Sequence, residues 1–419
     1  MSTPPQTPEL ALAEDPTAEV PAGLGRLGPV LGAANLSLLL PYNAASTLVQ
    51  ALLEQWDEHT KLSHYAILTT SGAVAAMVAN IGFGVLSDRT RSRWGRRNPW
   101  ILGGSLGTAI AGCALSFTHS FPVLVLLWIA MQIGLNAVIG PLAALLPDRV
   151  AQRNLGRASA WIGIGSLLAM SIGGAGAGLL VAAPAAGLRW IFWLMPLGGL
   201  LIWLAAPDRS SAALAREPFT ARKLLWTALP PRDADYVWAL LGRLFTGLGL
   251  NLVLVYQLYI LTDYLKLSTS HAGSVIAVAA ALTAVTAGIG IATAGPLSDR
   301  LGRRKIFVVS AAAAAAASVL PLVIVPSLGA FFTFVIVAGL GYGCYVAVDQ
   351  VVMAEVLPDG EHRAKDLGIL NIANTMPQVL APVVAVAVVP GLGYRPLLAL
   401  SIVLAAAGGL CMLPIRRVT

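Results

Sequence analysis

Long apolar stretches recur along the 419-residue chain, and charged residues or Pro and Gly bound each of them. A helical segment of about 20 residues spans a hydrocarbon core roughly 30 Å thick. Because lipid offers backbone groups no hydrogen-bonding partner, each stretch must be helical to cross it. Hydrophobic residues make up 57% of the chain, which fits this interpretation. The sequence therefore predicts an all-α, polytopic membrane protein that contacts the lipid bilayer along most of its length.

The apolar stretches fall into two groups of six, separated by a polar segment. We predict spans at 29–53, 62–86, 99–118, 122–146, 158–182 and 189–206, and then at 237–262, 271–296, 306–325, 330–357, 367–389 and 396–413. This division predicts a disordered N-terminal tail at 1–26, a six-helix bundle at 27–206, a linker at 207–236, a second six-helix bundle at 237–413 and a short tail at 414–419.

Positive charge is concentrated in alternate loops, most densely at 89–97, where five arginines follow one apolar stretch. The net charge of +7 is therefore spread over short groups between apolar segments. Nucleic-acid binding requires a continuous basic surface, so we expect no nucleic-acid partner. Loops rich in Lys and Arg remain in the cytoplasm. The bias predicts that both termini are cytoplasmic and that the chain lies in the plasma membrane.

Two loop sequences repeat between the halves and connect the chain to a family. "GVLSDRTRSRWGRR" begins at residue 84, and "GPLSDRLGRRK" begins at residue 295. Both resemble the loop signature of the major facilitator superfamily, which follows the second and eighth spans. "NLSLLLPYN" at 35–43 resembles the first span of sucrose transporters, and "RSRWGRRNPWI" at 91–101 is similar to the loop of glycoside-pentoside-hexuronide cation symporters. The resemblance implies two pseudo-symmetric six-helix bundles and a transport function.

The same motifs predict a cytoplasmic gate, in which acids and arginines at helix ends form ion pairs that break when the cytoplasmic side opens. The alternative is that the arginines only orient insertion and bind anionic headgroups. The predicted gate residues are Asp88, Arg89, Arg97, Asp148, Asp299, Arg300, Arg304, Glu355 and Asp359.

Polar side chains at helical spacing on several spans predict a solute site, because polar groups in lipid should face an internal cavity. Neutral donors and acceptors combined with aromatic rings suit a sugar. The alternative is that they only join helices by hydrogen bonds. The candidate binding residues are Asn35, Tyr42, Asn43, Ser46, Gln50, Gln132, Asn136, Tyr256, Tyr259, Tyr342, Tyr345, Asn371, Asn374 and Gln378.

Asp349 is the most deeply placed acid in the predicted spans. A buried carboxyl can bind a proton reversibly, which makes Asp349 a candidate proton-coupling group. Arg243 lies inside the seventh span and offers the alternative of a structural ion pair with Asp349. The second and fourth spans lack the acids that melibiose-type symporters use for cations, so sodium coupling by that route is not expected.

These features favour a proton-coupled importer of a sugar or glycoside. A proton-coupled exporter of drugs or metabolites is the alternative, because Gly165, Gly174 and Gly178 approximate the exporter glycine spacing, although Leu179 replaces the expected Pro. A membrane enzyme or ATPase is disfavoured by the absence of a G-x-x-x-x-G-K-[ST] loop. We expect a monomer without cofactor or metal.

Overall fold

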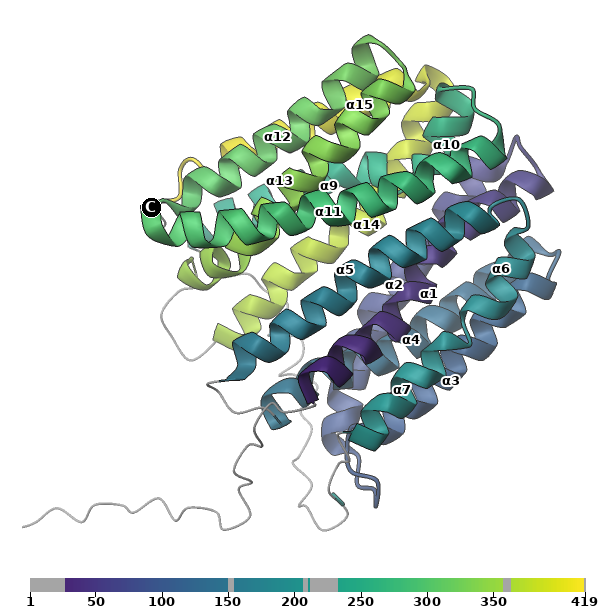
Figure 1. Ribbon diagram of the computed structural model, residues 1–419, viewed down its shortest axis with the longest axis vertical. Helices are drawn as coiled ribbons and strands as arrows, with labels where there is room; N and C mark the ends of the chain where they lie inside the picture. The colour runs from purple at the N-terminus through teal and green to yellow at the C-terminus, as the bar shows by residue number, and fades with distance from the viewer. Residues whose placement is uncertain (1–26, 150–153, 206–209, 212–232, 357–362, 418–419) are drawn as a thin grey trace, which may run out of the picture.

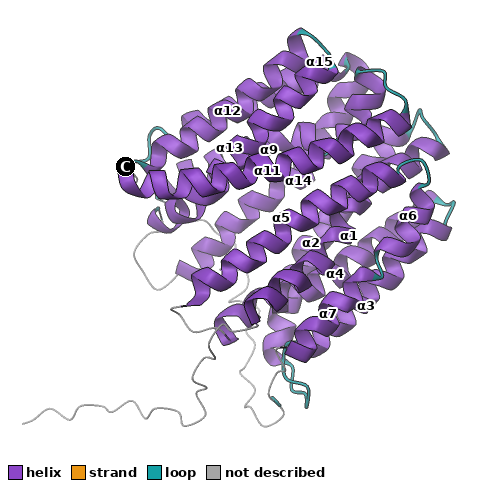
Figure 2. Ribbon diagram, in the orientation of Figure 1, coloured by secondary structure: helices purple, strands orange, loops and turns teal. Residues whose placement is uncertain are grey.

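The computed structural model describes residues 27–149, 154–205, 210–211, 233–356 and 363–417, apart from some side chains within the helices. The predicted tail at 1–26 and most of the predicted linker at 207–236 lie outside these residues. Figure 2 shows that the described residues form helices and connecting loops, with no strand among them.

The helices of the N-terminal half are α1 (Leu27–Trp56), α2 (Lys61–Arg89), α3 (Asn98–Ala114) with the short η1 (Leu115–Phe117), α4 (Phe121–Arg149), α5 (Leu155–Leu180), α6 (Pro184–Ile191) and α7 (Leu194–Ala205). Those of the C-terminal half are α9 (Ala234–Leu254), α10 (Gln257–Tyr259), η3 (Ile260–Tyr264), α11 (Thr269–Leu301), α12 (Arg304–Ile324), α13 (Leu328–Glu355), α14 (Arg363–Leu392) and α15 (Tyr394–Cys411).

Within the described residues, 12 helical segments are long and apolar enough to cross a membrane. Two of these segments are composite, because α3 continues into η1 and α6 continues into α7. The prediction of an all-α, twelve-span membrane protein is therefore confirmed.

Equivalent helices pack in the same way in both halves. In the first half α4 packs against α2 and α3, and in the second half α13 packs against α11 and α12. The halves meet along two related helix pairs, α5 with α11 and α2 with α14. Figure 1 shows α5 and α11 running side by side between the two bundles.

The two ends of the bundle differ in their loops. We call the end that carries residues 90–97 and 302–303 the basic end, because it holds the repeated arginine motifs. We call the opposite end, which carries residues 57–60 and 265–268, the far end. These names state nothing about which compartment each end faces.

The seventh span is interrupted near the far end. After α9 ends at Leu254, the chain forms the single turn α10 and then the π-helix η3. The Leu265 amide donates to the Ile260 carbonyl at 2.9 Å, the i to i−5 bond of a π-helix. This widened turn determines the directions in which Tyr259 and Asp263 point.

Close helix contact in the first half depends on glycine. Gly165 of α5 lies against the backbone of Gly32 in α1, so that a Cβ added at Gly165 would collide with the Gly32 carbonyl oxygen. Small residues of this kind let membrane helices approach closely. Asn35 also joins the two helices, because its Nδ2 donates to Ser166 Oγ at 2.6 Å and to the Ile162 carbonyl at 3.0 Å.

We expect Gly165→Leu to destabilise the protein by about 1–3 kcal/mol, because overpacking forces α1 and α5 apart. Gly163→Leu is the matched control. Gly163 lies on the same helix, and a Cβ added there meets nothing within 4 Å. Both changes gain the same helix propensity. Thermal unfolding in detergent measures the difference, and equal melting temperatures for the two variants would contradict the packing argument.

Candidate functional site

The polar residues of α1 divide into two groups. Asn35 is buried and bonded to α5, as described above. Tyr42, Asn43 and Ser46 are partly exposed. The Asn43 amide donates to the Leu39 carbonyl of its own helix at 3.0 Å. The structure therefore places Asn35 in a helix contact, and the solute-binding role of the other three remains a prediction.

Three tyrosines from both halves meet at the far end, and we call Tyr65, Tyr256 and Tyr259 the tyrosine cluster. The ring centroid of Tyr65 lies 5.6 Å from that of Tyr256 and 6.0 Å from that of Tyr259, and both ring pairs are edge-to-face. The Tyr65 hydroxyl lies 2.9 Å from Ser46 Oγ and accepts from Gln50 Nε2 at 3.1 Å. Edge-to-face pairs of this kind add to the energy of burial.

The tyrosine cluster also connects the halves directly. Tyr259 donates to the Gln50 carbonyl at 3.1 Å, which links the seventh span to α1. Tyr256 donates to the Pro382 carbonyl of α14 at 3.4 Å. Tyr65 was not among the sequence candidates, although Lys61, Tyr65 and Thr69 share one face of α2 at a spacing of four residues.

On α4, Gln132 and Asn136 are buried and face α2. Asn80 of α2, which the sequence analysis did not select, donates to Asn136 Oδ1 at 3.1 Å. Gln132 Oε1 has no hydrogen-bond partner among the described residues. Tyr42 of α1 adjoins the Gln132 side chain. The structure thus brings candidates from α1 and α4 together.

Arg243 and Asp349 form an ion pair inside the second half. Arg243 Nη2 lies 3.0 Å from Asp349 Oδ2, and the two side chains are only 5% and 3% exposed. Asp349 Oδ1 has no hydrogen-bond partner among the described residues, and the Tyr345 ring lies beside the pair. A buried pair of this kind is strongly destabilised when one partner is removed.

Two further candidates of the second half have exposed side chains. Tyr342 is 42% exposed, and Gln378 is also exposed. The side chains of Asn371 and Asn374 lie outside those that the structure describes, so their predicted role remains a prediction.

A network of charged and polar side chains joins the two halves at the far end. We call its members, Glu54, Lys61, Asp263 and Tyr394, the far-end clasp. Lys61 Nζ of α2 lies 2.7 Å from Asp263 Oδ1 of η3, so this pair links the two halves. The Lys61 side chain is only 4% exposed. The Tyr394 hydroxyl donates to Asp263 Oδ2 at 2.9 Å, and Lys61 lies 3.6 Å from Glu54 Oε1.

The far-end clasp was missed in the sequence because its members belong to four separate helical segments. Asp263 stands in the polar stripe of the seventh span, but no pattern identifies Lys61 as its partner 202 residues away. A lysine at the first position of an apolar helix is the only local signal.

At the basic end, the structure describes an ion pair between two of the predicted gate residues, but the pair lies within one loop and does not join Arg97 to the ends of spans four or ten as predicted. Arg97 Nη1 lies 2.7 Å from Asp88 Oδ1 and donates to Ser87 Oγ at 2.7 Å. Arg97 is buried, whereas the Asp88 side chain is 59% exposed. The pair therefore fixes the loop between α2 and α3.

The other predicted gate residues are less completely described. Arg89 and Arg304 are partly buried and have interactions with neighbouring groups, and Arg300 is exposed. The side chains of Asp148, Asp299 and Glu355 and the whole of Asp359 lie outside the described part of the chain.

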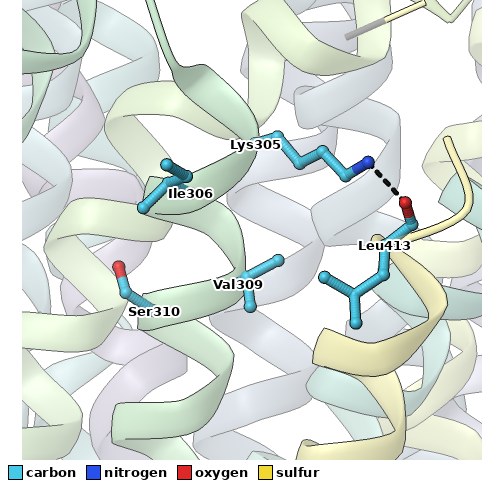
Figure 3. Close-up of a pocket in the computed structure, with 5 residues that line it drawn as sticks. All are labelled: Lys305, Ile306, Val309, Ser310 and Leu413. Atoms are coloured by element: carbon cyan, nitrogen blue, oxygen red, sulfur yellow. Dashed lines mark hydrogen bonds between the residues drawn. The ribbon is translucent and has the colours of Figure 1, made fainter. Parts of the chain in front are cut away.

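Figure 3 shows a shallow pocket of about 250 Å³ at the basic end, lined by Lys305, Ile306, Val309, Ser310 and Leu413. Lys305 Nζ donates to the backbone carbonyls of Leu413 and Ile415 and so ties α12 to the end of α15. The pocket includes none of the candidate binding residues, and the lysine is already engaged. Among the described residues, no group of three or more His, Cys, Asp or Glu could hold a metal ion.

We expect Asp349→Asn to lower the free energy of unfolding by about 3–5 kcal/mol, because it leaves the Arg243 charge buried without its counter-ion. Arg243→Met combined with Asp349→Asn removes both charges and should recover a large part of that loss. Thermal unfolding in detergent compares the variants. An Asp349→Asn variant with the same melting temperature as the unaltered protein would contradict the assignment of a buried ion pair.

Solved transporter structures share this fold along almost the whole chain. A D-xylose-proton symporter matches with a TM-score of 0.71 and 15% identity, covering 94% of this chain and 98% of that one. A POT family transporter in complex with 5-aminolevulinic acid matches with a TM-score of 0.75 and 12% identity, covering 93% and 96%. At these identities the likeness concerns the fold alone.

Among curated proteins, the chain is similar to Sucrose transport protein SUT1 of Oryza sativa subsp. japonica, with 30% identity over 188 residues. The match covers 36% of this chain and about a third (33%) of the relative. The model of the Major Facilitator Superfamily matches residues 30–287 and 239–419. Together with the twelve spans and the two equivalent halves, this match establishes that the chain belongs to the major facilitator superfamily and is a transporter rather than an enzyme.

Proposed function

We propose that this transporter moves a neutral polar solute, a sugar or glycoside, across the plasma membrane by alternating access, as a monomer and coupled to protons. The observation that carries the proposal is the neutral, hydroxyl-rich group of mostly buried side chains where the halves meet at the far end. There Ser46, Gln50 and the tyrosine cluster supply hydroxyls, an amide and aromatic rings. Such groups suit a solute that stacks on rings and exchanges many hydrogen bonds.

The sugar assignment draws further support from the relatives. The rice protein is named a sucrose transport protein, and one solved structure of this fold is a D-xylose-proton symporter. Other structures of the fold are peptide and nucleoside transporters, so the fold alone favours no solute. The neutral character of the site is what favours a sugar over a charged solute.

We assign the basic end to the cytoplasm, because Lys and Arg accumulate in loops that stay on that side. The far end then faces outward. Contacts between the halves at that end include the pair Lys61–Asp263, the bond from Tyr259 to Gln50, and the close approach of Gly178 to Gly273. They support a conformation closed toward the outside and ready to exchange solute with the cytoplasm.

We propose Asp349 as a proton-coupling residue and Arg243 as its partner. Protonation of Asp349 would leave the Arg243 charge buried without a counter-ion, which is unfavourable in a low-dielectric interior. Proton binding must therefore be accompanied by a rearrangement of α9 relative to α13. A proton then acts on transport through its different affinity for the two conformations.

We expect sugar uptake into proteoliposomes to accelerate when a pH gradient is imposed, because coupled sites typically change each other's affinity by roughly 5- to 150-fold. In the combined variant Arg243→Met with Asp349→Asn, the acceleration should disappear while uptake down the sugar's own gradient persists. The double variant avoids the buried charge that Asp349→Asn alone would leave. Uptake of radiolabelled sugars measures both quantities.

Two outcomes would contradict this proposal in different ways. If the pH gradient still accelerates uptake in the double variant, Asp349 is not a coupling residue, although the sugar assignment survives. If no saccharide moves and lipophilic cations are instead expelled against a proton gradient, the chain is an exporter.

The basic-end residues are proposed to form a cytoplasmic gate, with the Asp88–Arg97 pair holding the loop in position. We expect Asp88→Asn to reduce uptake about fivefold or more through lost coupling between conformations. Stability should fall by less than about 1 kcal/mol, because Asp88 is exposed. Asp57→Asn, at an exposed carboxylate of the far end, is the control. Unchanged turnover in Asp88→Asn would argue against the gate.

A further inference from the structure

In the far-end clasp one lysine faces two carboxylates, and one of these carboxylates accepts many more hydrogen bonds than the other. Asp263 accepts from Lys61 at 2.7 Å, from Tyr394 at 2.9 Å and from Thr262 at 3.0 Å. Glu54 lies 3.6 Å from Lys61 through Oε1, and its Oε2 is buried with no hydrogen-bond partner among the described residues. Asp263 is thus solvated by protein donors as a carboxylate, and Glu54 is not.

The charges of the clasp do not balance when both acids are ionised. One ammonium then faces two carboxylates in a place where Lys61 is 4% exposed and Glu54 is 17% exposed. An ionised carboxylate that lacks both water and donors is costly to bury. A proton on Glu54 would neutralise the excess charge, whereas a proton on Asp263 would weaken the three hydrogen bonds that its carboxylate accepts.

Titratable or charged groups from several elements act on Glu54. They are Lys61 of α2, Asp263 of η3, Glu58 of the loop after α1, Tyr259 of α10 and Tyr394 of α15. Lys61 is the cation of this set, and Glu58 adds a further negative charge.

Asp57, in the same loop, belongs to a separate group of contacts. Its carboxylate accepts from the Thr60 hydroxyl at 2.7 Å and from the His59 amide at 2.9 Å, and these bonds lower the pKa of Asp57. Asp57 is therefore ionised throughout the range in which a less well solvated carboxyl would titrate.

We propose that Glu54 is a proton-binding residue of the far-end clasp, whose protonation accompanies closure of this end and whose ionisation accompanies its opening. When the end opens, water reaches Glu54 and solvates the carboxylate. When it closes, Glu54 loses that water and gains only a distant partner. Proton binding and closure therefore favour each other reciprocally. The opening itself rests on the proposed alternating access.

The experiment measures the closed-to-open ratio of the far end by double electron–electron resonance in lipid nanodiscs. Spin labels at Ser120 and Val325, exposed positions of the two halves, report on the distance in a cysteine-free background. In the parent protein we expect the closed-to-open ratio to fall between about pH 5 and about pH 8, by at most tenfold per pH unit for one proton.

Glu54→Gln should hold the far end closed at every pH, because the amide mimics the protonated carboxyl. Glu58→Gln is the matched control and should keep the pH response, since it removes the same charge four residues away on an exposed side chain. Glu54→Met provides a second neutral variant with the same expectation if the glutamine variant folds poorly.

A pH response that persists in Glu54→Gln and Glu54→Met would overturn the proposal. So would opening of the far end in these variants at all pH values, because Glu54 would then act as an ionised partner of Lys61. Sugar uptake by the same variants in proteoliposomes separates this inference from the proposed function. Intact uptake with a pH-independent far end refutes only the role of Glu54, and a Glu54-dependent pH response without uptake refutes only the sugar assignment.

Discussion

The lack of hydrogen-bonding partners in lipid is the constraint on which this structure depends. It forces every span to be helical, and it places polar side chains where another helix or an internal surface can receive them. Three hydrogen bonds between helices meet this requirement: Asn35 donates to Ser166, Asn80 donates to Asn136, and Ser401 donates to the Gly249 carbonyl. The same rule explains why a chain with 11% charged residues buries some of them only as pairs.

The two halves are held together by close packing and by polar bonds at one end. The packing depends on residues without side chains, since a Cβ at Gly178 or Gly273 would meet the backbone of the other half. The polar bonds depend on Lys61 and Asp263, whose attraction in a largely buried place is stronger than that of a surface pair. Apolar contact contributes as well, because one buried cluster contains residues of both halves, such as Leu31 and Leu398.

The fold could be predicted from the sequence, because span length, hydropathy and the repeated loop motif are local properties. The site was predictable only in part. Polar stripes identified Ser46, Gln50 and Tyr259, and the structure brings these together around Tyr65. Periodicity could not separate Asn35, which joins two helices, from residues that can reach a solute. Nor could it pair Lys61 with Asp263, because that contact depends on how two bundles meet rather than on either sequence segment.

The π-helix η3 carries a further consequence. An inserted residue in the i to i−5 turn shifts the side chains beyond it by about 100° around the helix axis relative to an unbroken α-helix. Asp263 lies inside this widened turn and contacts Lys61 from it. If Ile260–Tyr264 were rewound as an α-helix, the Asp263 carboxylate would rotate away from Lys61. A local change of helical winding could thus release the contact between the halves at the far end, before any bundle moves as a whole.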